Sequence, residues 1–368
     1  MLLAVLQMRF TQIFKPITRP LPVLFLLTFS TTAHATTLTP EVSIPQKTTS
    51  NVLTISTRES ETPAPITAQK EHSSLPQTCA HIRYTKVNIT EKGVSYHNLT
   101  LTIPSDSFSQ QQTPYRLHAA QMQLTAQPFS SLPQPKNIFN NMAEAASVAL
   151  VLSLTGHHNA ACAHWLEKQG QQAWRFLIEG KNMAFSWNAA TISLGKVALG
   201  LKSAQLILQG STHDKRSEAS LAFNGLDYHN IAYEAFFPSQ AHVTFSIPAS
   251  ELPTFLSTLG TTTAKADQAI HLRVTDLNAT RGNITLHGYG QATFTGDMHS
   301  STASGHLEIS HLDTLIALTR AERQMNLMAA LVLARLVSHH TDTANTWNTA
   351  WENGVLTING FPLPSLIK

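Results

Sequence analysis

The sequence predicts an α+β fold, with curved antiparallel β-sheets or meanders, a few helices, and one long buried helix near the C-terminus. Three observations support this class. Apolar and polar residues alternate over much of residues 79–312, as in half-buried strands. Turn-forming residues recur at the roughly 8–12-residue spacing that is typical of meanders. Residues 138–154 are helical by composition and too long for a strand, and residues 313–338, amphipathic in the first half and apolar nearly all round in the second, predict a long helix.

The first 35 residues are typical of an export signal. Arg9, Lys15 and Arg19 precede a short apolar run at 21–29, and Ala33-His34-Ala35 matches the A-x-A cleavage pattern. The run is shorter than the roughly 20 residues that span a bilayer. We therefore expect a cleaved signal and a periplasmic or exported protein. The alternative is an uncleaved signal that anchors the chain to the inner membrane.

The charge balance of the mature chain gives no sign of a nucleic-acid partner. The full chain has 25 Lys+Arg and 22 Asp+Glu. Residues 1–35 hold three of the bases and none of the acids, so the remainder carries 25 − 3 = 22 bases against 22 acids. No basic stripe alternates with aromatic residues, and nucleic-acid binding is therefore not expected.

Residues 36–78 are rich in Thr, Ser and Pro and have no aromatic residue, which predicts a disordered linker. The folded, β-rich region is expected to cover 79–368. It can be divided into two subdomains, about 79–210 and 211–368.

The expected elements follow in chain order. Alternating residues between 79 and 124 predict strands, with a turn at Lys92-Gly93. Residues 138–154 and 160–170 predict two helices separated by a turn at Gly156 and His157. Further strands are expected at 174–178, 183–187, 191–201, 204–209, 219–226 and 242–247, then a short helix at 252–259, a meander over 270–312, the long helix at 313–338 and a last strand at 355–358.

No standard catalytic spacing identifies an active site, and no residue is assigned a catalytic, cofactor-binding or metal-binding role. Gly288-Tyr289-Gly290 begins like a dinucleotide-binding motif but lacks the third glycine. Ser193 and Lys196 match S-x-x-K, which requires the serine at a helix N-terminus, whereas this stretch alternates like a strand.

The tripeptide Cys-Ala-His occurs twice, beginning at Cys79 and Cys162, which are the only cysteines. Two Cys and two His formally make a zinc set. However, Cys162 and His164 are two apart in an expected helix and point in nearly opposite directions. An exported chain with two cysteines favours a disulfide between Cys79 and Cys162, with two free thiols as the alternative. The nearby histidines are then expected to be mostly solvent-facing.

The C-terminal half resembles an alphaproteobacterial family of exported envelope proteins of unknown function, β-rich and loosely similar to AsmA-like proteins. The features that carry the resemblance are G-x-G-x-A at 288–292, G-x-L-x-I at 305–309, HVTFSIPASELPTFL at 242–256 and the ending WENGVLTINGFPLPSL at 351–366. The resemblance covers about 200–366 and brings no catalytic residues. It implies a role in envelope integrity or lipid handling.

The expected function is that of a non-enzymatic envelope protein, peripheral to the membrane at most, that binds lipid or another amphipathic ligand or supports another envelope protein. One alternative is an exported hydrolase that uses Ser193 and Lys196 or an unrecognised site. Another is a metal-binding protein that uses the Cys/His set.

Overall fold

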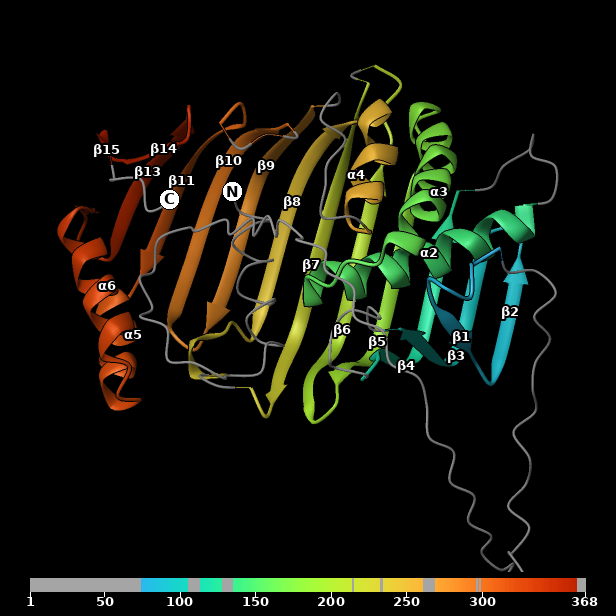
Figure 1. The fold of residues 1–368 in the computed structure, drawn as a ribbon, viewed down its shortest axis with the longest axis horizontal. Coiled ribbons are helices and arrows are strands. Elements are labelled where there is room, and N and C mark those ends of the chain that lie inside the picture. The colour runs from blue at the N-terminus through green and yellow to red at the C-terminus, as the bar shows by residue number, and fades with distance from the viewer. Residues whose placement is uncertain are drawn as a thin grey trace, which may run out of the picture.

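The computed structural model describes residues 74–104, 113–127, 135–213, 215–231, 234–260, 269–295, 297 and 299–362. Within these residues all strands belong to one 15-stranded sheet (Figure 1). The predicted α+β class is wrong: strands make up 49% of the structure and helices 28%, so the protein is mainly an antiparallel sheet that carries helices. Successive strands pair directly with one another, which leaves no separate second layer of sheet.

The strands follow one another across the sheet almost in chain order, β1-β3-β4-β5-β6-β7-β8-β9-β10-β11-β13-β14-β15, with β2 paired to β3 and β12 to β13. The strands are β1 (His81–Arg83), β2 (Lys86–Thr90), β3 (Gly93–Ile103), β4 (Tyr115–Ala126), β5 (Met183–Leu194), β6 (Val197–Gln209), β7 (Arg216–His229), β8 (Gln240–Pro248), β9 (Ile270–Arg281), β10 (Ile284–Phe294), β11 (Thr302–Ser310), β12 (His339–His340), β13 (Ala344–Glu352), β14 (Val355–Ile358) and β15 (Phe361–Pro362).

The register gives the sheet one apolar and one polar face. Directly paired residues share a face, and the alternation along each strand keeps apolar partners together. The apolar pairs run across the whole sheet, from Leu101↔Leu117 and Met122↔Trp187 through Phe245↔Val274 to Trp351↔Leu356. Strands β6 and β7 pair over Ala198–Gln209, so the sheet continues past residue 210 without a break.

Three helices cover the apolar face over the first half of the sheet: α2 (Pro135–Thr155), α3 (Ala160–Ile178) and α4 (Leu252–Thr258) (Figure 1). Their buried side chains join those of β3–β7 in the largest hydrophobic cluster. Helix α2 is long and apolar enough to cross a membrane, but 72% of its most apolar window is buried inside the protein. Helix α2 is therefore a core helix of the folded protein.

A chain of buried polar groups connects α2 to the sheet. Trp187 Nε1 donates to Ser147 Oγ (3.0 Å), and Tyr96 Oη donates to Asn140 Oδ1 (2.5 Å). Burial, and then the charge of Glu144, raise the pKa of the Tyr96 hydroxyl well above its usual range. The hydroxyl therefore stays protonated and remains a donor. These bonds fix the position of α2 over β3 and β5.

The predicted strand at 174–178 is wrong, because these residues form the last turns of α3. Phe176 and Leu177 are buried while Arg175 is not, which fits a helix face as well as it fits a strand. Strand β13 was not predicted. Ordered structure also begins before residue 79: Leu75 is 8% exposed, and Trp165 Nε1 donates to Ser74 Oγ (3.1 Å), although 74–78 were assigned to the linker.

The predicted long buried helix at 313–338 is also wrong. The segment forms two helices, α5 (Leu312–Ala321) and α6 (Met325–Leu336). Between them Arg323 adopts a left-handed φ of 56°, which ends the first helix. Arg335 Nη1 donates to Asp313 Oδ1, so the end of α6 lies beside the start of α5. No residue of α6 is buried, because the helix lies at the far end of the sheet with only one face packed.

Candidate functional site

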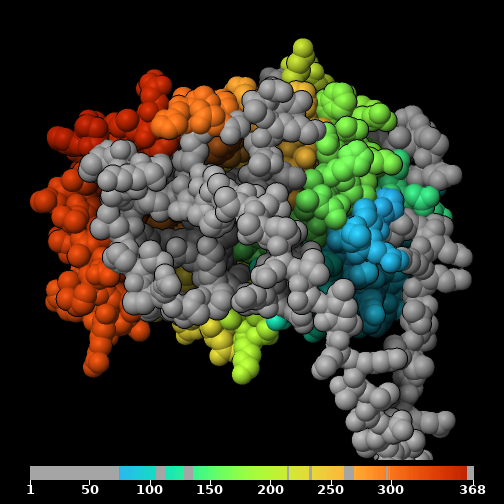
Figure 2. Space-filling model, viewed as in Figure 1, coloured from blue at the N-terminus to red at the C-terminus, as the bar shows by residue number. Residues whose placement is uncertain are grey.

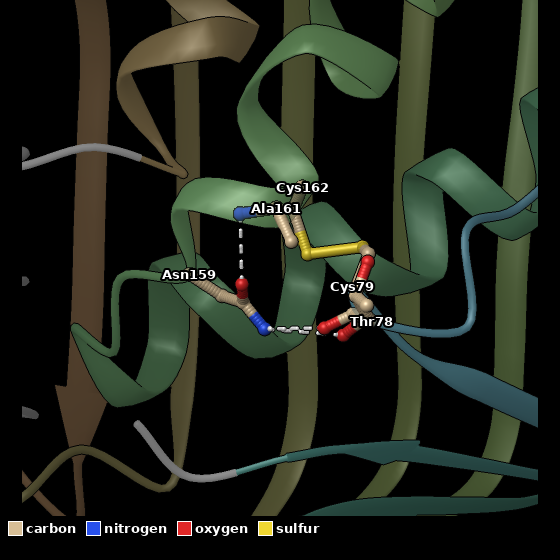
Figure 3. Close-up of a disulfide and its surroundings, with 5 residues drawn as sticks. All are labelled: Thr78, Cys79, Asn159, Ala161 and Cys162. Carbon is tan, nitrogen blue, oxygen red and sulfur yellow. Dashed lines mark hydrogen bonds between the residues drawn. A yellow bond between two sulfur atoms is a disulfide. The ribbon is translucent and has the colours of Figure 1, made fainter. Parts of the chain in front are cut away.

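The predicted disulfide is present: Cys79 and Cys162 are joined with an S–S distance of 2.15 Å (Figure 3). Both side chains are completely buried. Asn159 caps α3 by accepting a bond from Ala161 N (3.0 Å), and its Nδ2 donates to the carbonyl oxygens of Thr78 and Cys79 at 3.3 Å each. The bridge and the cap together attach the start of the ordered chain to α3, so this region has a structural role.

Because both cysteine sulfurs are bonded to each other, neither is available as a ligand for the metal site that the Cys/His set suggested. Among the described residues, no group of three or more His, Cys, Asp or Glu side chains is arranged to hold a metal ion. The neighbouring histidines divide between two environments. His164 is exposed on α3, whereas His157 and His158 are partly buried before the helix, and the His157 ring stacks on Tyr115 at 4.4 Å. Of the histidines near the disulfide, His81 and His164 are exposed as expected, whereas His157 and His158 are not.

Two other motifs lie in the sheet. Ser193 is on β5 and Lys196 lies in the hairpin turn before β6, so the serine is not at a helix N-terminus as the S-x-x-K chemistry requires. Gly288 and Gly290 lie within β10, where the motif that resembles a dinucleotide-binding loop forms no turn from strand to helix.

The polar face carries a hydrogen-bonded row that sequence spacing did not reveal. The row crosses four strands, from Ser220 on β7 through His242 and Asp276 to His287 on β10. Ser220 Oγ lies 2.9 Å from His242 Nε2, and His242 Nδ1 lies 3.1 Å from Asp276 Oδ2. The other carboxylate oxygen, Oδ1, lies 3.1 Å from His287 Nε2. The members come from positions up to 67 residues apart, so only the register of the sheet could bring them together.

A β-bulge in β9 places Asp276 in this row. The pairing shifts between Thr244 and Phe245 on β8 and between Gly288 and Gly290 on β10, opposite the same point of β9. The extra residue lets Val274 and Leu277 both remain buried on the apolar face. The two residues between them are left for the polar side, which is why strict alternation fails here.

Ser220, His242 and Asp276 have the connectivity of a Ser–His–Asp triad. A working triad also needs N–H donors for the oxyanion, and backbone donors of strands β7–β9 are committed to the sheet ladder. The polar row is also open to water, since the side chains of His242 and Asp276 are 41% and 38% exposed. We infer that the row stabilises the sheet through cross-strand bonds.

A Ser220→Ala variant tests that inference. We expect the wild type and the variant to hydrolyse a nitrophenyl ester at the same background rate, because no stabilised oxyanion can form at Ser220. The measurement is the initial rate against protein concentration for the wild type, Ser220→Ala and His242→Ala, with His164→Ala as a control for the reactivity of a surface histidine. A rate that depends on Ser220 and His242, and not on His164, would show that the row is catalytic.

Helix α6 presents an apolar stripe to solvent. Its inward residues Met328, Leu331 and Ala334 pack on a cluster that includes Trp347, and Trp347 Nε1 donates to Ala334 O (2.7 Å). The opposite side of the helix bears the α6 stripe, whose members recur at helical spacing: Met325, Ala329, Val332, Leu333 and Leu336. Leu333 and Leu336 are 61% and 80% exposed. In Figure 2 the C-terminal elements, orange to red, form one end of the visible face.

Cationic side chains flank the α6 stripe. Arg320 and Arg323 precede the helix, Arg335 lies in its last turn, and His339 and His340 follow. Between residues 311 and 340 there are three arginines against the carboxylates of Asp313 and Glu322.

No protein-family model, curated protein or solved structure matches this chain. The resemblance to a family of exported, AsmA-like envelope proteins remains a prediction.

Proposed function

We propose that this chain is a non-enzymatic envelope protein that attaches to a lipid surface through the α6 stripe. The observation that carries the proposal is a helix with apolar residues on both sides, of which only one is packed against the protein. Contiguous exposed apolar residues on a folded protein mark an interaction site. The predicted export signal supports an envelope location, where membrane surfaces are the abundant apolar partner.

A lipid surface fits the α6 stripe better than a second protein copy. A helix of 12 residues is roughly 18 Å long, so one side of it offers on the order of 200 Å². A stable protein interface buries about 800 Å² on each partner. An interfacial helix instead inserts a few apolar side chains among lipid headgroups and is helped by flanking cations when the lipids are anionic. Arg320 and Arg323 provide that complementarity, whereas Arg335 is paired with Asp313.

The test is flotation of the mature protein with vesicles of phosphatidylcholine and phosphatidylglycerol. The double variant Leu333→Asp/Leu336→Asp should bind these vesicles more than one-hundred-fold more weakly. Each leucine contributes about 1.5–3 kcal/mol when it enters an apolar phase, and each added carboxylate costs about 1 kcal/mol more near an anionic surface. The variant should fold normally because both side chains point to solvent, and circular dichroism checks this.

Asn326→Asp is the matched control, because it adds a negative charge to the same helix and leaves the α6 stripe intact. It should weaken binding by tenfold or less, at about 1 kcal/mol per charge near an anionic surface. Vesicle binding that is equal for the wild type and the double variant would contradict the proposal. So would a wild-type dimer in gel filtration that the double variant converts to a monomer.

A further inference from the structure

The polar face of the sheet is hollowed across β9–β13, away from α6. Two adjoining pockets lie there, with volumes of about 440 Å³ and 630 Å³. Both are lined by Arg273, Gln291 and Ser304, so together they form one trough, which we call the polar trough. It crosses the middle of the sheet, where the strand edges are already paired. A peptide therefore cannot bind there by adding a strand.

An exposed aromatic ring lies in the polar trough and is held from two neighbouring strands. Tyr289, opposite the bulge of β9, is 52% exposed. Its ring stacks on that of His306 with centroids 5.2 Å apart and planes at 21°. His306 is in turn held by Asn348, whose Oδ1 lies 2.8 Å from His306 Nδ1. A large aromatic side chain exposed this far, and positioned by a hydrogen-bonded partner, is suited to receive a flat ligand face.

Planar polar groups line the polar trough. Arg273 and Gln291 line both parts of the polar trough. Arg216 borders one end, where its Nε donates to Ser246 Oγ (3.3 Å) and its Nη2 to Ser246 O (3.0 Å). These bonds fix the plane of the guanidinium. Fixed, planar donors of this kind recognise carboxylates and hydroxyls with high directionality.

We infer that the polar trough binds an acidic oligosaccharide. The shallow, elongated shape suits a chain of rings, Tyr289 offers an aromatic surface to the C–H face of a sugar, and Gln291 and Ser304 offer partners to hydroxyls. Two arginines, Arg216 and Arg273, against the single carboxylate of Glu352 favour an anionic sugar. The site is independent of the attachment proposed for α6, because it lies on the other face of the sheet.

The experiment titrates the mature protein with tetragalacturonate as the acidic probe and cellotetraose as the neutral probe, followed by calorimetry. We expect tetragalacturonate to bind and cellotetraose to bind at least tenfold more weakly. Tyr289→Ala should weaken tetragalacturonate binding at least tenfold. Arg273→Gln should weaken tetragalacturonate binding by a similar factor and leave cellotetraose unchanged, because only the acidic probe offers it a carboxylate.

Thr285→Ala is the matched control, since Thr285 is on the same strand and face as Tyr289 but outside the polar trough. It should bind tetragalacturonate like the wild type. Absence of tetragalacturonate binding at millimolar concentration would overturn the inference. Equal binding of the two probes would also overturn it, as would tetragalacturonate binding that survives both Tyr289→Ala and Arg273→Gln. Vesicle flotation of the same variants should be unchanged, which separates this test from that of α6.

Discussion

Replacing Cys79 and Cys162 together with serine is expected to lower the free energy of unfolding by about 4 kcal/mol. The bridge links residues 83 apart, and a cross-link of that span removes a large loop-closure entropy from the unfolded chain. For a chain of this size the change corresponds to a fall in Tm of roughly 7 °C. The measurement is thermal unfolding followed by circular dichroism.

Reduction supplies the control for the disulfide. Dithiothreitol should lower the Tm of the wild type to that of the double serine variant and should leave the variant's Tm unchanged. A difference of less than about 1 kcal/mol between oxidised and reduced protein would contradict the prediction, and would mean that the reduced, unfolded chain already keeps the two cysteine segments close together.

Gly93→Ala is expected to destabilise the protein by about 3–4 kcal/mol. Gly93 begins β3 with a φ of 148°, and an added Cβ would lie 1.9 Å from the carbonyl oxygen of Leu124 on β4. An atom cannot occupy that position, so the first pair of the β3–β4 ladder must separate. Urea unfolding of the variant measures the loss.

Gly282→Ala separates backbone strain from steric overlap. Gly282 lies in the β9–β10 turn with a φ of 58°, but its added Cβ would meet nothing within 4 Å. The substitution should lower the free energy of unfolding by about 1 kcal/mol, because alanine disfavours a left-handed conformation by about that amount. Equal losses for the two variants would contradict the overlap at Gly93.

Much of the sheet could be predicted from the sequence, because its strands have one solvent-exposed face and one buried face. Residues Ile270, Leu272 and Val274 alternate in the sequence and are buried together in the structure. The disulfide could also be predicted, since a predicted export signal together with two cysteines favours pairing. These features depend on a local sequence pattern or on the number of cysteines, and both can be read from a single sequence.

The environment of α6 could not be predicted in the same way. NLMAALVLARLV is apolar on all sides, which normally indicates a buried helix. Whether a partner exists for each side depends on where the helix lies in the fold, and α6 lies at the end of the sheet. The strand assigned to 174–178 failed for a related reason, because a stretch of five residues, four of them apolar, is too short to distinguish the helix period from the strand period.

The candidate sites depend on register, which no local pattern contains. The polar trough combines residues of β9, β10, β11 and β13, and the row from Ser220 to His287 combines four strands. The bulge in β9 gave one usable signal: Val274 and Leu277 are three apart inside a strand of period two. Such a spacing indicates that two consecutive side chains turn to the same face.

The near-sequential strand order has a consequence for how the protein forms and changes. Most pairings join strands that follow each other closely in the chain, so most hairpins can form without waiting for distant segments. The main exceptions are β4–β5 and β11–β13, which are separated by α2–α3 and by α5–α6. For the same reason, insertion or loss of a hairpin leaves the other pairings unaltered, as in repeat proteins. Removal of one such hairpin would therefore narrow the sheet while the disulfide-linked helical end and α6 stay intact.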